Sequence, residues 1–198
     1  MKKLKVRLTF TEPLLGSSPN NEEIYEDFIG SKAPNAATME EEIESIGLAA
    51  VKEKGMTVFP RMDDGVTPFI YDYHIKGFFK DSCGGLRRVK DSKSSKIKAY
   101  KKEIDKLIFP KPRCIPIMNY GEIGKCQRPL RAMTMQGERV SLACSEEIQA
   151  GAFIEFSILI LSDDLEAVVR EWLDYGELAG FGQWRNSGKG RFTWEEIQ

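Results

Sequence analysis

The chain has 198 residues, of which 41% are hydrophobic and 30% charged, and its formal net charge is -1. These fractions are ordinary for a globular domain, and the near-neutral total gives no global sign of nucleic-acid or membrane affinity. No apolar run approaches the roughly 18 residues that a membrane helix needs, and no apolar stretch follows the basic N-terminus as it would in a secretory signal. We therefore expect a cytoplasmic protein with no membrane partner.

The first part of the sequence predicts a strand followed by two helices. Lys3–Phe10 alternates between apolar and polar residues, a period of two that is typical of a half-buried strand. A short helix is expected around Ile24–Phe28. A second helix is expected to begin at Thr38, where three glutamates occupy its first turn, and to end at Gly55. Thr57–Phe59 then predicts a brief strand.

The middle of the sequence predicts short elements separated by charged residues. Phe69–Tyr73 is expected to be extended and to lead into a helix that starts near His74. A further short helix is expected around Lys98–Leu107. Leu107–Phe109 and Cys114–Met118 are bounded or interrupted by prolines, which favours edge strands or extended crossings because proline cannot donate to a sheet ladder.

The last part of the sequence carries the clearest patterns. Arg131–Met135 and Arg139–Cys144 predict a hairpin. Ala152–Leu161 is almost wholly apolar, which indicates a central strand. Ser162 is the expected cap of a helix that ends at Gly176 and has one apolar face, made of Leu165, Val168, Val169, Trp172 and Leu173.

Arg191–Trp194 is expected to be the closing strand. The order strand–helix–strand then occurs twice, which is the ferredoxin-like pattern. The predicted fold class is therefore α+β: a ferredoxin-like (RRM-like) core with an antiparallel sheet and helices on one face. We expect residues 1–198 to form a single such domain, with a large insertion or second lobe within about residues 30–130.

Positive charge is concentrated between Arg87 and Arg113. This tract holds eleven Lys or Arg residues and three acids (Asp91, Glu103 and Asp105), a local balance of eleven minus three, or +8. Two interpretations stay open: an ordinary solvated lysine-rich loop, or a patch that neutralises phosphates.

A glycine-rich loop follows the last predicted helix, between Gly180 and Phe192. Its glycines permit positive φ angles and close backbone approach, and consecutive exposed amides can hold an anion. The loop also carries three cations, while Trp184 and Phe181 are candidates for stacking on a base. Dinucleotide-binding loops follow a strand and open a helix, the reverse of the order here, and a Walker loop needs Ser or Thr after its lysine. The alternative is that the glycines only turn the chain tightly.

Two segments resemble the RAMP superfamily, the ferredoxin-like RNA-binding proteins of CRISPR systems. Ala179–Gly182 and Gly188–Phe192 match the C-terminal glycine-rich loop of that superfamily, and Lys76-Gly77 matches the core of a second motif, in which Lys80 stands where arginine is usual. The resemblance implies binding of single-stranded RNA and protein partners in a CRISPR-type complex. With the basic tract, the predicted RNA-binding residues are Lys76, Lys80, Arg87, Arg88, Gly180, Gly182, Trp184, Arg185, Gly188, Lys189, Gly190 and Arg191.

Catalytic chemistry has one candidate, His74, the only histidine in the chain. Some RAMP members cleave RNA without metal by moving the 2′-OH proton with a histidine. A lone histidine beside aromatic residues is more often structural. The four cysteines include no C-x-x-C pair, so we predict reduced thiols, no metal site and no cofactor.

Three hypotheses follow. The first is a non-catalytic RNA-binding protein of RAMP type that grips the phosphate backbone with the glycine-rich loop and the Lys/Arg tract. The second is a metal-independent RNA endonuclease that uses His74. The third is an adaptor or inhibitor, encoded by a phage or other mobile element, that mimics a CRISPR complex subunit. Whether the protein is an enzyme stays open at this point, with the balance against it.

Overall fold

The computed structural model describes residues 1–20, 56–134 and 137–198, and the side chains of these residues outside 130–142. The chain forms two compact units. The first comprises Met1–Leu14, Pro60–Glu122 and Ile148–Gln198, and the second comprises Leu15–Phe59 and Ile123–Glu147. The helices expected around Ile24–Phe28 and between Thr38 and Gly55 lie outside the described residues. None of the helices in the described ranges is both long and apolar enough to cross a membrane.

The first unit is built on an antiparallel sheet in the order β11-β1-β10-β7-β5, with β6 also paired to β10. Its strands are β1 (Lys2–Phe10), β5 (Phe69–Tyr71), β6 (Ile108–Lys111), β7 (Cys114–Met118), β10 (Phe153–Ile160) and β11 (Phe192–Glu196). Taken as core strands one to four, β1, β6 with β7, β10 and β11 lie in the order four-one-three-two. This βαββαβ arrangement is ferredoxin-like, so the predicted fold class is confirmed.

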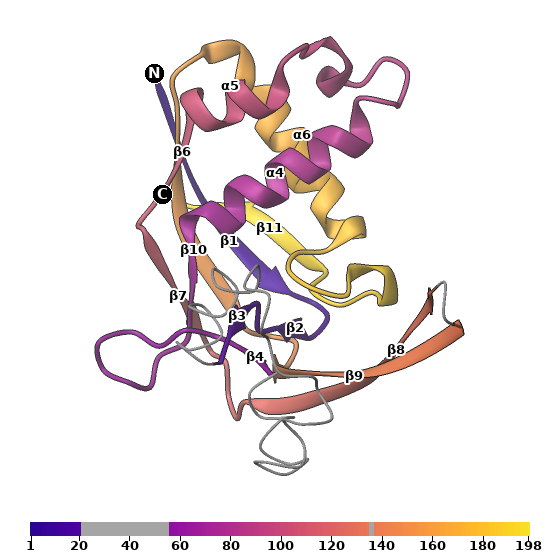
Figure 1. The fold of residues 1–198 in the computed structure, drawn as a ribbon. Coiled ribbons are helices and arrows are strands. Elements are labelled where there is room, and N and C mark those ends of the chain that lie inside the picture. Colours follow the sequence, from indigo (N-terminus) through magenta and orange to yellow (C-terminus); the bar gives the residue numbers. More distant parts are fainter. Residues whose placement is uncertain (21–55, 135–136) are drawn as a thin grey trace, which may run out of the picture. The chain divides into compact units, whose positions relative to one another are not determined.

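Three helices accompany this sheet: α4 (Asp72–Leu86), α5 (Tyr100–Leu107) and α6 (Glu166–Ala179). Helix α4 packs against β6 and α6 against β11, and the two helices also contact each other and cross on one face of the sheet (Figure 1). The apolar stripe predicted for α6 is buried, with Trp172 and Leu173 fully enclosed. The removal of these apolar side chains from water stabilises the packing of α6 in this layer.

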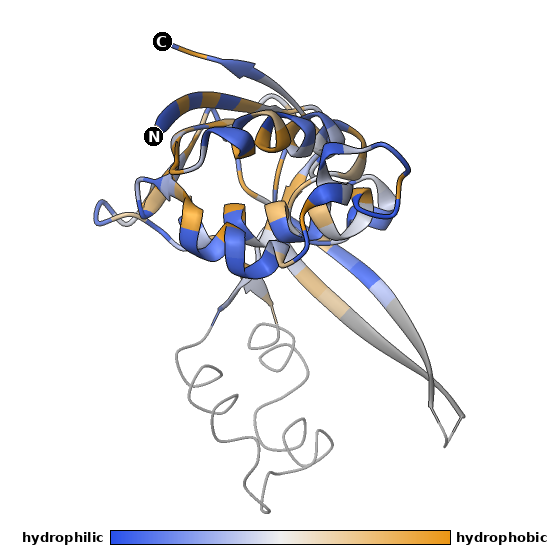
Figure 2. Cartoon of the chain, turned by 90° about the horizontal axis from the view of Figure 1, so that it is seen from above, coloured by the Kyte–Doolittle hydropathy of each residue, from blue (hydrophilic) through white to orange (hydrophobic). Residues whose placement is uncertain are grey.

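The alternation of β1 and β10 explains why these strands form the centre of the sheet. In β1, Leu4, Val6 and Leu8 are buried and their neighbours are more exposed, a banding that is visible along the N-terminal strand in Figure 2. They lie opposite Ile158, Phe156 and Ile154 of β10, which are also buried. The central position predicted for β10 is confirmed.

Several expected element boundaries were wrong. Helix α6 runs through Gly176 to Ala179, and Gly180, with φ of 76°, caps its C-terminus. Ser162 precedes a short 3-10 turn and makes no side-chain capping bond. Strand β7 lies between β10 and β5, so it is not an edge strand despite Pro116. Pro116 faces β5 in a ladder of only three residue pairs, and Ile115 and Ile117 on either side of it are buried.

The second unit contains the predicted hairpin, which is longer than expected. Strands β8 (Gly124–Thr134) and β9 (Gly137–Ile148) pair from Gly124↔Glu147 to Thr134↔Gly137. Strands β2 (Leu14–Leu15), β3 (Ser18–Pro19) and β4 (Thr57–Val58) complete this sheet in the order β2-β9-β4-β3. Thr57 and Ser145 share a hydroxyl hydrogen bond of 2.7 Å, and the Phe59 N–H donates to the Glu146 carboxylate at 2.8 Å.

Candidate nucleic-acid interface

The glycine-rich loop is a closed structure in which two glycines are required by the backbone. The Phe181 N–H donates to the Gly190 carbonyl at 2.8 Å, and the Gly190 N–H donates to the Pro13 carbonyl at 2.8 Å. Gly190 has φ of 71°, and a Cβ there would meet the Phe181 carbonyl oxygen; a Cβ on Gly180 would lie 2.6 Å from the Lys189 carbonyl oxygen. The interpretation that the glycines turn the chain tightly therefore accounts for these two positions without a ligand.

The two aromatic residues of the loop differ in exposure. Phe181 is 4% exposed, and its ring packs near those of Phe10 and Phe78, with centroids 6.4 and 5.9 Å away. Its expected role in stacking on a base is therefore wrong, because the ring belongs to the core. Trp184 is 39% exposed and has φ of 55°. A positive φ is unusual for tryptophan because the side chain crowds the backbone, so the surrounding loop must impose this conformation.

The cations of the loop also differ. Arg185 forms an ion pair with Asp81 of α4, with Nη1 and Oδ2 2.6 Å apart, which ties the loop to the helix. Arg191 is exposed and Lys189 is partly exposed. Gly182 and Gly188 both have positive φ, at 81° and 88°. Arg191 is thus the loop cation most accessible to a polyanion.

The basic tract is fixed to α6 by one carboxylate. Glu171 accepts hydrogen bonds from the Lys93 N–H at 2.8 Å, the Ser94 N–H at 3.0 Å and the Ser94 hydroxyl at 2.6 Å. The Ser94 hydroxyl in turn accepts from the indole of Trp172 at 2.9 Å. Glu171 thereby holds the 3-10 turn η1 (Lys93–Lys96) against the helix, while the Lys93 and Lys96 side chains remain exposed.

Lys76 and Lys80 share a face of α4, as their spacing predicts, and that face is turned toward α5. Lys80 forms an ion pair of 2.6 Å with Asp105, and the Lys76 ammonium donates to the Asp105 carbonyl at 3.1 Å and lies 4.5 Å from the centre of the Phe109 ring. The next residue, Asp81, binds the glycine-rich loop instead. Helix α4 therefore contacts the basic tract through these lysines and the loop through Asp81.

Arg87 and Arg88 lie just beyond the C-terminal end of α4. The Arg87 guanidinium lies 5.3 Å from the centre of the Tyr100 ring of α5, and Arg88 is exposed. The structure thus joins Arg87, Lys76 and Lys80 to α5. Arg185 belongs to a separate contact on the loop side.

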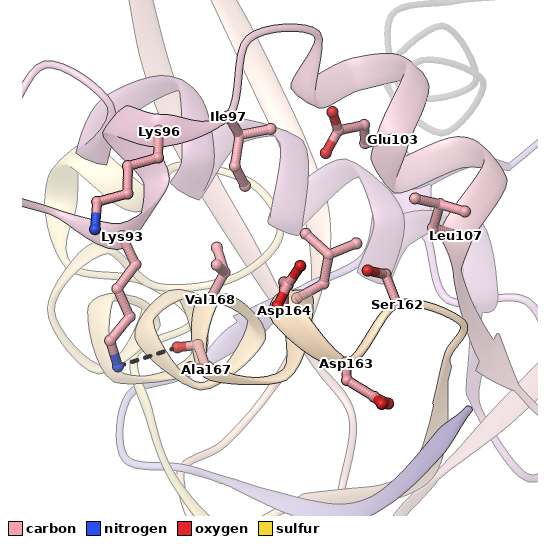
Figure 3. Close-up of a pocket in the computed structure, with 11 residues that line it drawn as sticks. Lys93, Lys96, Ile97, Glu103, Leu107, Ser162, Asp163, Asp164, Ala167 and Val168 are labelled. Carbon is pink, nitrogen blue, oxygen red and sulfur yellow. Dashed lines mark hydrogen bonds between the residues drawn. The ribbon is translucent and has the colours of Figure 1, made fainter.

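A pocket of about 600 Å³ opens beside the basic tract, between η1, α5 and the start of α6 (Figure 3). Its floor includes Ile97, Leu165 and Val168, all nearly buried. Lysines and acids line its polar part together: Lys93, Lys96, Glu103, Asp163 and Asp164. The mixed charge gives this pocket no preference for a phosphate.

His74 lies in the first turn of α4 beside two tyrosine rings, 4.5 Å from Tyr73 and 6.2 Å from Tyr71 between centroids. Burial lowers the pKa of its imidazole, and the nearby Asp72 carboxylate opposes this only in part. The ring is therefore neutral at pH 7. The four cysteines form no disulfide with one another, and the residues that the structure describes contain no group of three or more His, Cys, Asp or Glu that could hold a metal ion.

The extended structure expected for Phe69–Tyr73 ends at Tyr71, because helix α4 begins at Asp72 and includes Tyr73 and His74. Phe69, Tyr71 and Tyr73 alternate along the chain, and their rings lie close together in the structure.

Comparison with known proteins gives one informative result. No protein-family profile matches the sequence, and no curated protein matches it either. The fold is similar to that of a chain in the cryo-EM structure of the Type III-B Cmr-β bound to cognate target RNA, with a TM-score of 0.53 and 10% sequence identity. The similarity covers 100% of this chain and 60% of the other, so this chain spans about three fifths of the length of its structural neighbour. At this identity the similarity shows the fold alone.

Proposed function

We propose that this protein is a non-catalytic RNA-binding protein of RAMP type, which contacts the phosphate backbone of single-stranded RNA through its basic tract and glycine-rich loop. The observation that carries the proposal is the surface of α5. Lys98, Lys101, Lys102 and Lys106 are all exposed there, on or beside a helix that buries only Ile104. The fold shared with a chain of an RNA-bound complex supports the same conclusion.

The lysines of α5 remain accessible to a polyanion because Asp105, an acid of the same helix, pairs with a lysine of another helix. Asp105 stands four residues after Lys101 and three after Lys102, positions from which an acid would ordinarily pair with them. It pairs instead with Lys80 of α4, at 2.6 Å. Exposed cations of this kind bind nucleic acid by releasing the counterions condensed on its phosphates.

The test is a salt titration of RNA binding by two matched double variants. Lys101→Gln with Lys102→Gln removes two charges from α5, whereas Lys3→Gln with Lys5→Gln removes two from exposed positions on β1. The α5 variant is expected to reduce the slope of log K against log salt by about 1.4, at about 0.7 per phosphate contact with a single strand. The β1 variant is expected to keep the slope. Equal slopes in wild type and the α5 variant would remove α5 from the interface.

The adaptor hypothesis makes a different prediction for the same sample. A protein that mimics or caps a CRISPR complex would capture a protein partner and carry no nucleic acid. The ratio of absorbance at 260 and 280 nm of freshly purified protein separates the two, since bound RNA raises it. The RNA-binding proposal expects nuclease treatment to lower this ratio.

A further inference from the structure

A column of aromatic rings begins in the core of the first unit and ends at its surface. Phe69 is 5% exposed and meets Tyr71 edge-on, with centroids 4.9 Å apart and planes at 85°. Tyr71 then stacks on Tyr73, with centroids 5.0 Å apart and planes at 16°. Tyr73 is 46% exposed. The outermost ring is therefore supported by two others and still presents much of its surface to solvent.

A guanidinium lies beside the two tyrosines and is itself held in place. The central carbon of the Arg113 guanidinium is 5.6 Å from the centre of the Tyr71 ring and 5.4 Å from that of Tyr73. Arg113 Nη1 pairs with Asp72 Oδ1 at 2.7 Å, and the Asp72 N–H donates to the Arg113 carbonyl at 2.9 Å. Three aromatic rings and one cation are thus held together by residues from β5, from the start of α4 and from the position just before β7.

The inner rings pack within the fold, whereas Tyr73, which also lies edge-on to His74 with ring centroids 4.5 Å apart, is the most exposed of the three. Phe69 and Tyr71 flank Ile70, which is 4% exposed, and tie β5 to β7. Nearly half of Tyr73 remains in water, and that part of its apolar area contributes nothing to folding. Rigid tyrosine rings offer contact area at a low cost in conformational entropy, and nucleobases stack readily on aromatic rings and guanidinium planes.

This surface also lies next to the basic tract. Lys76, one turn after Tyr73, donates to the Asp105 carbonyl near the end of α5. Lys111 of β6, two residues before Arg113, is exposed. The column of aromatic rings and the α5 lysines therefore belong to the same unit. A single strand whose phosphates contact those lysines has the column nearby, beyond the end of α5.

We propose that Tyr73, supported by Tyr71 and Arg113, is a stacking site for one unpaired nucleobase of single-stranded RNA. The inference rests on the proposed RNA-binding function and adds to it a contact with a base instead of a phosphate. Because every base has an aromatic face, the site is expected to tolerate any sequence. It discriminates unpaired from paired bases, since a paired base is already stacked in its helix.

The experiment uses the full chain and an oligo-U RNA that carries a single 2-aminopurine, whose fluorescence falls when the base stacks. Saturating wild-type protein is expected to quench the 2-aminopurine. Tyr73→Ala is expected to weaken binding by roughly 5-fold to 150-fold, which corresponds to the loss of one stacked base, with an unchanged salt slope. Tyr73→Phe keeps the ring and is expected to bind as wild type does. Leu178→Ala, at a site that is 74% exposed on α6, is the matched control and is expected to have no effect.

The outcomes separate the two proposals. Failure of wild-type protein to bind the RNA would overturn the proposed function. Binding of wild type without quenching, or with equal affinity for Tyr73→Ala, would overturn the stacking site alone. If Tyr73→Ala does not fold, the wild-type measurement still tests the site, because absence of quenching by wild type would overturn it.

Discussion

Gly176 provides a quantitative test of the packing beneath the glycine-rich loop. It lies inside α6, and a Cβ added there would meet the Phe192 ring and lie 2.5 Å from the tip of the Phe78 ring. Both rings are buried, at 1% and 6% exposure, so neither can swing into solvent. Phe78 also packs against Phe181, with centroids 5.9 Å apart, so crowding at Gly176 is transmitted to the loop.

Gly77 is a matched control, because it also lies inside a helix, α4, and a Cβ there would have no neighbour within 4 Å. Replacing glycine by alanine in a helix interior stabilises it by roughly 0.5–1 kcal/mol, a gain common to both sites. The difference between Gly176→Ala and Gly77→Ala is therefore the cost of crowding, about 1–3 kcal/mol. Each kcal/mol shifts the melting temperature of a chain this size by about 2–4 °C.

Thermal unfolding of the two variants, followed by circular dichroism, measures this difference. Gly77→Ala is expected to melt slightly above wild type and Gly176→Ala below Gly77→Ala by the amount above. Equal melting temperatures for the two variants would refute the close helix–ring packing on which this reasoning depends.

Three further predictions concern the loop, the histidine and a turn. Gly190→Ala, which places a Cβ against the Phe181 carbonyl at φ of 71°, is expected to lower both the melting temperature and the RNA affinity, measured on one preparation. His74→Ala is expected to leave the integrity of bound RNA unchanged on a denaturing gel; cleavage by wild type that this variant abolishes would favour the endonuclease instead. Hydrogen bonds from the Thr67 hydroxyl and the backbone N–H groups of Val66 and Thr67 hold the pKa of Asp64 below its ordinary value. A lowered carboxylate pKa stabilises the fold above the unfolded value near 3.9 and ceases to do so as pH falls through the folded value. Wild type should thus melt above Asp64→Asn at pH 6, and the gap should close in strong acid; a constant gap would contradict this.

Much of the fold could be predicted because periodicity reports burial directly. The alternation of β1 and the apolar stripe of α6 each identify an element and the face that it buries. The prediction that Gly176 ends the helix is wrong for a physical reason. A helix interior tolerates glycine where another chain segment approaches closely. Only the fold reveals that Phe78 and Phe192 approach Gly176 in this way.

The candidate site was less predictable, because its arrangement depends on contacts between distant residues. The sequence indicates that the tract is basic, but Glu171, which anchors it 77 residues from Ser94, has no local signal. In the same way, Arg113 joins Asp72 and the tyrosines only because β7 pairs with β5. The loop glycines could be recognised from their spacing, whereas the burial of Phe181 between Phe10 and Phe78 could not.

The most direct test of the central claim is a titration of fluorescently labelled single-stranded RNA with wild-type protein, followed by anisotropy at several salt concentrations. The account predicts binding at low salt and a linear fall of log K with log salt, because phosphate contacts release counterions. Absence of binding at micromolar protein and low salt, or an affinity that does not change with salt, would contradict it.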